Sequence, residues 1–125
     1  MTAQQIAPVV LVVDDDPDIL ATIGQILDLE GYGVLRARNG QEAFVVLETE
    51  RPALIILDLM MPVMDGWEFR RRLTDHPAGL TPVLIVSADR DLAGKAASLN
   101  AQGYIAKPFD LDVLVAAVQR FAPLT

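Results

Sequence analysis

Four carboxylates lie within five consecutive positions near the amino terminus, at Asp14, Asp15, Asp16 and Asp18. They follow an apolar run from 9 to 13, and a second apolar run, from 54 to 57, ends at another acid, Asp58. Buried strands of parallel sheets are nearly continuous Val, Ile and Leu runs, and the ligand crevice of an open α/β sheet lies beyond their carboxyl ends. We therefore expect several negative charges to meet at one crevice. Their repulsion favours raised pKa values or a bound cation, and Mg²⁺ is a hard ion that prefers carboxylate oxygens.

Two further polar residues follow apolar runs later in the chain. Ser87 comes after the run from 83 to 86, and Lys107 comes after the run from 104 to 106. If these runs are neighbouring parallel strands, a hydroxyl and an ammonium join the acids at the same edge. That combination suits a phosphoryl group together with its metal ion.

Each residue at the expected crevice has a chemical role in such a site. Asp58 could attack phosphorus as a carboxylate nucleophile and form an aspartyl phosphate. Mg²⁺ held by Asp15, Asp58 and Asp14 would neutralise charge on the transferring group, and Lys107 would act as a point charge on a phosphoryl oxygen. Ser87 could donate a hydrogen bond to another oxygen. Because no histidine, cysteine or second acid is placed to drive repeated hydrolysis, we expect a phosphate acceptor rather than an enzyme.

The elements that must position these residues alternate along the chain. Strands are predicted at about 9–13, 34–37, 54–57, 83–86 and 104–106. Helices are predicted from Asp16 to Gly31, from Asn39 onward, at about 67–74 and 91–99, and from Asp110 onward. Strand and helix in alternation imply right-handed crossovers and a doubly wound five-stranded parallel sheet with helices on both faces. The carboxyl ends of all five strands then face one edge.

Particular residues set the ends and buried faces of these helices. Asp16 is the expected N-cap before Pro17, and Asn39 with Glu42 resembles a capping box. Gly94 and neighbouring alanines predict that the fourth helix is the least stable element. The last helix begins at its N-cap, Asp110, and is expected to bury Leu111, Leu114, Val115 and Val118.

Composition restricts the class of protein. The 125 residues are 52% hydrophobic and 22% charged, which is a globular balance and predicts one folded domain over 1–125. A net charge of −7 lacks the basic patch of a nucleic-acid binder, so we expect no direct nucleic-acid contact. There are no cysteines, no signal-peptide pattern, and no apolar run near the roughly 18 residues of a membrane span. These features predict a cytoplasmic protein that has no membrane partner.

Four stretches together resemble one family. They are Val12-Val13-Asp14-Asp15-Asp16-Pro17, Asp58-Leu59-Met60-Met61-Pro62-Val63-Met64-Asp65-Gly66, Ser87-Ala88 and Lys107-Pro108-Phe109. In order and spacing they resemble the response-regulator receiver domain of two-component signalling, over nearly the whole chain. The resemblance implies the flavodoxin-like strand order 2-1-3-4-5.

The resemblance also implies a role for each matching residue. Asp58 matches the phosphoacceptor, which a sensor histidine kinase or a histidine phosphotransfer protein would charge. Asp14 and Asp15 match the acidic pair that binds Mg²⁺, with the backbone carbonyl of Met60 as a further ligand. Lys107 precedes a peptide to Pro108 that is usually cis in the family.

A conformational switch is implied as well. In the family, phosphorylation draws the residue at the position of Ser87 toward the phosphoryl group, and the aromatic residue at the position of Tyr104 turns inward. The face formed by the fourth helix, fifth strand and fifth helix then changes shape for a downstream effector. Phosphate thus selects one of two pre-existing states.

Three other classes were weighed against this prediction. A dehalogenase-type phosphatase that forms an aspartyl phosphate needs a second acid two residues after the nucleophile, where this chain has Met60. A flavin binder needs a phosphate loop after the first strand, where Asp14, Asp15 and Asp16 would repel phosphate. A degenerate receiver, acting as a phosphorylation-independent docking module, would lack Asp58 or Lys107. A phosphoryl-accepting switch is therefore the preferred function.

Overall fold

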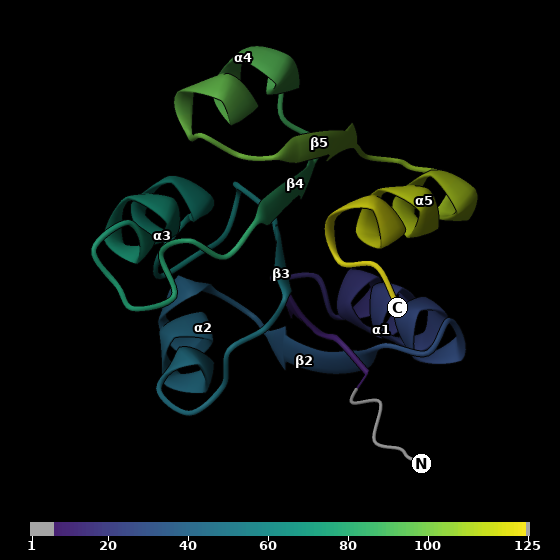
Figure 1. Ribbon diagram of the computed structural model, residues 1–125. Coiled ribbons are helices and arrows are strands. Elements are labelled where there is room, and N and C mark those ends of the chain that lie inside the picture. Colours follow the sequence, from purple (N-terminus) through teal and green to yellow (C-terminus); the bar gives the residue numbers. More distant parts are fainter. Residues whose placement is uncertain (1–6, 125) are drawn as a thin grey trace.

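The computed structural model describes residues 7–124, in which five strands alternate with five helices (Figure 1). The strands are β1 (Val9–Val13), β2 (Gly33–Ala37), β3 (Leu54–Leu57), β4 (Val83–Ser87) and β5 (Gly103–Ala106). The helices are α1 (Pro17–Leu29), α2 (Gly40–Leu47), α3 (Gly66–Leu73), α4 (Leu92–Ser98) and α5 (Leu111–Phe121). The sequence predicted every one of these elements, and those bounds that it predicted differ from the observed ones by at most two residues.

The strands form one sheet in the order β2-β1-β3-β4-β5, and every neighbouring pair is parallel. Helices α1 and α5 cover one face, and α2, α3 and α4 cover the other (Figure 1). The α/β class, the doubly wound sheet and the strand order 2-1-3-4-5 are thus confirmed. In the register, Val13 of β1 lies between Ala37 of β2 and Leu57 of β3, so these three strands end at the same level.

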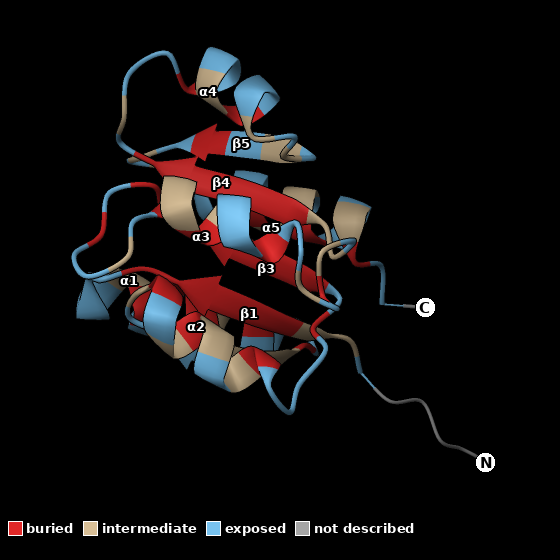
Figure 2. Ribbon diagram, turned by 90° about the vertical axis from the view of Figure 1, so that its left-hand side faces the viewer, coloured by how far each residue is buried: buried red, intermediate tan, exposed pale blue. Residues whose placement is uncertain are grey.

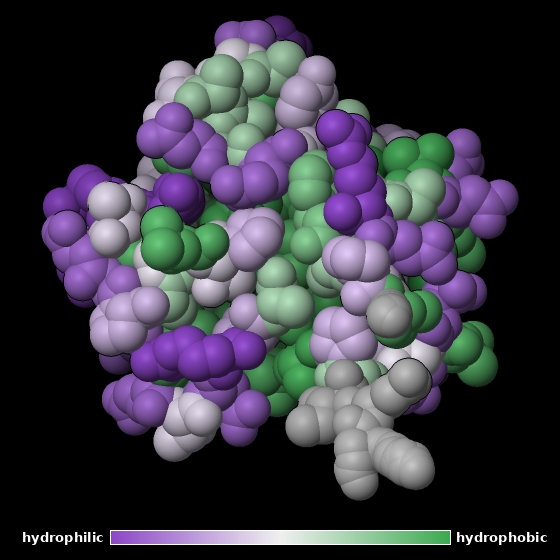
Figure 3. All heavy atoms as spheres, in the orientation of Figure 1, coloured by the Kyte–Doolittle hydropathy of each residue, from purple (hydrophilic) through white to green (hydrophobic). Residues whose placement is uncertain are grey.

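Two hydrophobic cores lie on opposite faces of the sheet. Alternate residues of β1 divide between them: Val10 and Val12 face α1 and α5, whereas Leu11 and Val13 face α2 and α3. The central strands β1, β3 and β4 are almost entirely buried (Figure 2). This double burial is the reason that their sequences are continuous apolar runs. Viewed as in Figure 1, hydrophilic side chains cover much of the outer surface of the helices (Figure 3).

Side-chain caps fix where the first three helices begin. The carboxylate of Asp16 accepts a hydrogen bond from the backbone N–H of Asp18, and Pro17 is the first residue of α1. Asn39 Oδ1 accepts from the N–H of Glu42 at 2.9 Å. The expected capping box is only half formed, because the Glu42 carboxylate accepts from the N–H and guanidinium of Arg38 instead of from Asn39.

The first turn of α5 departs from the sequence prediction in two respects, its cap and the burial of Leu111. Asp110 is the N-cap residue of α5, but its side chain makes no capping hydrogen bond. Leu111, predicted to be buried, is 48% exposed because the first turn of α5 lies at the edge of the sheet, where it borders a groove. Leu114 and Val118 are buried as predicted, and Val115 is half-buried. In α4, Ala96 is buried against the core beside Leu92.

Within residues 7–124 every helix is too short or too polar to cross a lipid bilayer.

Candidate functional site

The carboxyl edge of the sheet, on the left of Figure 2, brings together residues that are far apart in the sequence. Asp14 follows β1, Asp58 follows β3, and Lys107 follows β5. Each is held by one more backbone hydrogen bond of the parallel ladder: Asp14 N–H to Ala37 at 3.1 Å, Asp58 N–H to Val13 at 3.0 Å, and Lys107 N–H to Ser87 at 2.9 Å. The regular sheet itself therefore fixes the backbone positions of these three side chains.

Lys107 bridges the two buried carboxylates. Its Nζ donates to Asp14 Oδ2 at 2.7 Å and to Asp58 Oδ2 at 3.2 Å. Asp14 is 3% exposed and Asp58 is 6% exposed, so both charges are largely removed from water. The peptide between Lys107 and Pro108 is cis, as the family resemblance led us to expect. Hydrogen bonds from an ammonium to carboxylates are charge-assisted and stronger than those between neutral groups.

The three predicted acids form one cluster. Asp14, Asp15 and Asp58 each offer one carboxylate oxygen, and these oxygens all lie within 4.8 Å of one another. It is the only group of three or more such side chains in residues 7–124 that is close enough to share a metal ion. Oxygen donors from carboxylates, with one of them open to solvent, fit a divalent cation such as Mg²⁺.

The remaining carboxylate oxygens are oriented by nearby backbone groups. Asp14 Oδ1 accepts from the N–H of Asp16 at 2.9 Å, and Asp58 Oδ1 accepts from the N–H of Met60 at 3.3 Å. These contacts hold the carboxylates toward the open edge. The Met60 side chain itself is exposed, and the role of its carbonyl as a metal ligand stays a prediction.

Burial and neighbouring charges shift the pKa values of Asp14 and Lys107. Burial raises the pKa of the Asp14 carboxyl more than the hydrogen bonds from Lys107 and from the Asp16 N–H lower it, and the charge of Asp58 raises it further. Burial alone would lower the pKa of Lys107, but the hydrogen bonds and charges of Asp14 and Asp58 raise it overall. One ammonium thus faces three carboxylates, and a bound cation would relieve the imbalance.

Ser87 and Tyr104 lie on β4 and β5. Ser87 is fully buried, and its Oγ accepts a hydrogen bond from the N–H of Asp89 at 3.3 Å. Tyr104 is half exposed at the edge strand. In the register Tyr104 lies opposite Ile85, two residues before Ser87, so Tyr104 and Ser87 are placed on the same face of the sheet. The structure thus brings all of the predicted site residues to one edge or one neighbouring strand pair.

Two residues near this edge have roles that sequence reasoning missed. Gly66 is the first residue of α3, and a Cβ there would lie 2.5 Å from the Asp58 carbonyl oxygen, so only glycine allows this approach. Asp89 forms an ion pair with Lys95 of α4 at 2.8 Å. The Asp65-Gly66 pair in the sequence could have indicated the close packing at Gly66. Nothing in the sequence indicated the ion pair of Asp89 with Lys95.

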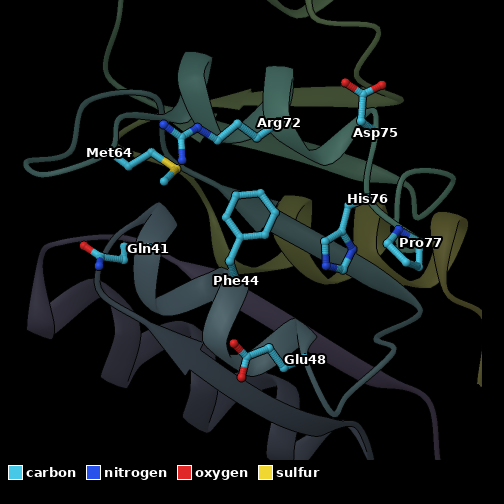
Figure 4. A pocket seen from close by; sticks show the side chains of 8 residues that line it. All are labelled: Gln41, Phe44, Glu48, Met64, Arg72, Asp75, His76 and Pro77. Carbon is cyan, nitrogen blue, oxygen red and sulfur yellow. The ribbon is translucent and has the colours of Figure 1, made fainter.

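A separate groove lies between α2 and α3, away from the carboxylates (Figure 4). The rings of Phe44 and His76 meet there with centroids 5.5 Å apart. His76 Nδ1 accepts a hydrogen bond from the Ala78 N–H at 3.0 Å, which gives this histidine a structural role.

The fold and the site define a doubly wound domain with a lysine-bridged cluster of acids at the carboxyl edge of its sheet. A model of the response regulator receiver domain family matches residues 10–119. The chain belongs to this family. Receiver domains are phosphorylatable switches of two-component systems and are generally not enzymes.

Curated relatives agree with this assignment. The chain is 32% identical over 116 residues to sporulation initiation phosphotransferase F of Bacillus subtilis, covering 92% of this chain and 94% of that protein. It is 36% identical over 114 residues to transcriptional regulatory protein CrdR of Helicobacter pylori, covering 90% of this chain and 54% of that protein. The chain therefore spans nearly all of one relative and about half of the other.

Solved structures show the same fold. Chemotaxis protein CheY4 of Vibrio cholerae superimposes with a TM-score of 0.85 at 30% identity, covering 93% of this chain and 99% of that one. Response regulator protein TrrA of Thermotoga maritima, in complex with Mg(2+)-BeF, superimposes with a TM-score of 0.81 at 29% identity, covering 91% of this chain and 98% of that one.

Proposed function

We propose that this chain is a single receiver domain, over residues 1–125, that accepts a phosphoryl group on Asp58. The donor would be a phosphohistidine of a sensor histidine kinase or of a histidine phosphotransfer protein. The observation that carries the proposal is the contact of Lys107 Nζ with both Asp14 and Asp58, beside the exposed carboxylate of Asp15. An ammonium and three carboxylates supply a nucleophile, a metal site and a positive charge, which together suit phosphoryl transfer.

The transfer needs a nucleophile on this chain and a leaving group on the donor. An Asp58 carboxylate oxygen attacks phosphorus, a new O–P bond forms, and the P–N bond to the donor imidazole breaks. The imidazole nitrogen leaves with the electron pair and takes a proton from solvent. Lys107, already 3.2 Å from Asp58, is placed to balance charge on a phosphoryl oxygen, and Ser87 is proposed to donate a hydrogen bond to another.

The reaction is proposed to depend on Mg²⁺. Asp14, Asp15, Asp58 and the carbonyl of Met60 would hold the ion, which neutralises charge on the transferring group when bound. Two observations support this: the three carboxylates have oxygens within 4.8 Å of one another, and the related TrrA was solved with Mg(2+)-BeF.

The donor protein is proposed to contact an apolar groove beside the site. The groove is lined by Ile19, Thr22, Ala88, Lys107, Pro108, Phe109 and Leu111. It joins the start of α1 to the turn that follows β5, and Lys107 belongs both to it and to the acidic site. A partner seated there would bring its phosphohistidine to the same edge of the sheet as Asp58.

The output is proposed to follow from Ser87 and Tyr104. If the Ser87 hydroxyl turns toward the phosphoryl group, it vacates space on the face of the sheet that it shares with Tyr104. The half-exposed Tyr104 ring could then turn inward and reshape the surface of α4, β5 and α5 for a downstream effector. Because the whole chain has a net charge of −7, we do not expect this surface to bind nucleic acid directly. Cytoplasmic location stays a prediction.

No alternative function is favoured by these observations. A dehalogenase-type phosphatase would carry an acid at position 60, where the exposed Met60 stands. A degenerate receiver would lack one member of the pair that Asp58 and Lys107 form here. Slow loss of the phosphoryl group to water, without further turnover, is proposed to end the signal.

Intact-mass spectrometry tests the proposal. The protein is incubated with acetyl phosphate, with and without Mg²⁺, beside an Asp58→Asn variant. The expected result is a single phosphoryl adduct, labile in base, on the wild type in the presence of Mg²⁺ and on no other sample. An adduct that persists in Asp58→Asn would assign the acceptor elsewhere, and an adduct independent of Mg²⁺ would remove the metal from the reaction.

A further inference from the structure

The loop between β4 and α4 is bound at two points through one residue, Asp89. Its backbone N–H donates to Ser87 Oγ at 3.3 Å, and its carboxylate Oδ1 lies 2.8 Å from Lys95 Nζ. The side chains of Lys95 and Asp89 are 29% and 21% exposed, so the pair is partly shielded from solvent. The hydrogen bond from Lys95 lowers the pKa of Asp89, so this carboxylate is charged at neutral pH.

Helix α4 has little else that fastens its start to this loop. Its N-cap residue Asp91 has a left-handed backbone, with φ at 49°, and its side chain makes no capping hydrogen bond. The helix is seven residues long and buries only Leu92 and Ala96. Among the described residues, the Asp89–Lys95 contact is the one side-chain hydrogen bond or ion pair that joins the loop to this helix.

From this arrangement we infer that Lys95 is a positioning residue that, through Asp89, holds the Ser87 hydroxyl in its unphosphorylated orientation. The inference rests on the proposed function, in which Ser87 turns toward a phosphoryl group on Asp58. That turn removes the acceptor of the partly buried Asp89 N–H, which is unfavourable unless the loop moves as well. Because Lys95 is anchored on α4, movement of the loop separates Lys95 from Asp89. The ion pair thus opposes the phosphorylated conformation.

The expected size of the effect follows from measured ion pairs of this kind. Partly exposed pairs shift an equilibrium by about two- to fivefold. In a two-state switch, loss of the pair shifts the population toward the phosphorylated conformation by the same factor. A lower concentration of a phosphoryl mimic is then needed to bring half of the molecules into the phosphorylated conformation.

The test uses the full chain with Mg²⁺ and beryllofluoride as a phosphoryl mimic. Backbone NMR signals of α4 and of Ser87 report the conformation while beryllofluoride is added. Lys95→Met is expected to lower the half-saturating concentration by about two- to fivefold. Loss of a positive charge would by itself weaken binding of an anion, so the expected change is opposite in sign to a simple charge effect.

Arg38→Met is the matched control. It removes a cation from the 3.0 Å ion pair with Glu42 near the start of α2, and it changes net charge by the same amount. Its half-saturating concentration is expected to equal that of the wild type or to exceed it slightly. Lys95→Arg, which keeps the charge, is expected to restore the wild-type value.

A double-mutant cycle separates action through Asp89 from other effects. Asp89→Asn and Lys95→Met are combined, and the double variant is expected to respond like Lys95→Met alone, because either change removes the same pair. If Lys95→Met proves unfolded, the half-saturating concentration of Asp89→Asn tests the same ion pair. A half-saturating concentration for Lys95→Met equal to that of Arg38→Met, or higher, overturns the inference. If the NMR spectrum of the wild type does not change when beryllofluoride and Mg²⁺ are added, both the proposed function and this inference are overturned.

Discussion

Lys107 and Asp14 are 93 positions apart in the sequence, yet the lysine Nζ lies 2.7 Å from Asp14 Oδ2. The contact joins the ends of β1 and β5, which are separated in the sheet by β3 and β4. Lys107 Nζ also lies 3.2 Å from Asp58 Oδ2, just after β3, so a single ammonium contacts both buried acids.

Replacement of Lys107 by Met is expected to destabilise the protein in the absence of divalent cations. Asp14 and Asp58 would remain buried without the ammonium that balances their charge. Loss of one partner from a buried ion pair costs about 3–5 kcal/mol, and nearness to solvent reduces this to roughly 1–3 kcal/mol here. Urea denaturation measures the difference. A variant as stable as the wild type would mean that the lysine contributes nothing to the resting structure.

Mg²⁺ is expected to stabilise the wild type against heat. An ion that binds only the folded state stabilises it by about 2.7 kcal/mol at 100 times its Kd. Asp15→Asn should lose most of this effect, because Asp15 is the exposed member of the carboxylate cluster. Asp28→Asn, an equal change of charge at the other end of α1, should retain it. Differential scanning fluorimetry with and without EDTA checks both, and equal responses of the two variants would contradict the assigned site.

Gly66→Ala is expected to displace the backbone of Asp58 and Leu59 and so to disturb the site. The new Cβ would lie 2.5 Å from the Asp58 carbonyl oxygen and 2.7 Å from Leu59 Cα, and both are backbone atoms that cannot move away alone. Overpacking of this kind costs about 1–3 kcal/mol. Denaturant unfolding should show that loss, and acetyl phosphate should phosphorylate the variant more slowly. Unchanged stability would show that the loop after β3 shifts freely.

Tyr32→Phe is expected to cost about 0.5–1.5 kcal/mol, because the buried Tyr32 hydroxyl donates to the Ala122 carbonyl at 2.7 Å. Burial raises the pKa of Tyr32, and the charge of Glu30 adds to this. The unfolded chain therefore loses the tyrosine proton first as pH rises above about 10, and the contribution of Tyr32 to stability falls from there. Urea titrations from pH 8 to 11 should show a steeper decline in the wild type than in Tyr32→Phe. Parallel curves would contradict the assignment.

Helix α4 is expected to exchange its amide hydrogens faster than α1. It has seven residues and two buried side chains, whereas α1 has thirteen residues and buries four. Elements with few buried contacts open most easily. Hydrogen exchange followed by mass spectrometry measures the difference, and equal protection of the two helices would contradict it.

Much of the fold was predictable because local sequence and position in the sheet agree. A run such as Leu54–Leu57 can be buried on both faces only in a central parallel strand, and Asp16 and Asn39 each carry the side chain that begins a helix. The edge of the sheet was less predictable. Leu111 has the spacing of a core residue, yet it begins α5 and borders a groove, and its side chain is half exposed.

The sequence by itself determined which chemical groups the protein carries and at which strand ends they stand, because acids, hydroxyl and lysine each follow an apolar run. The tertiary structure alone decided which of them touch. Parallel register brings Asp14 and Asp58 to one level, and Lys107, two residues beyond that level after β5, reaches both carboxylates with its long side chain. The turn into α4 places Asp89 against Lys95. Such contacts depend on distances between segments distant in the chain, and no local pattern of residues encodes those distances.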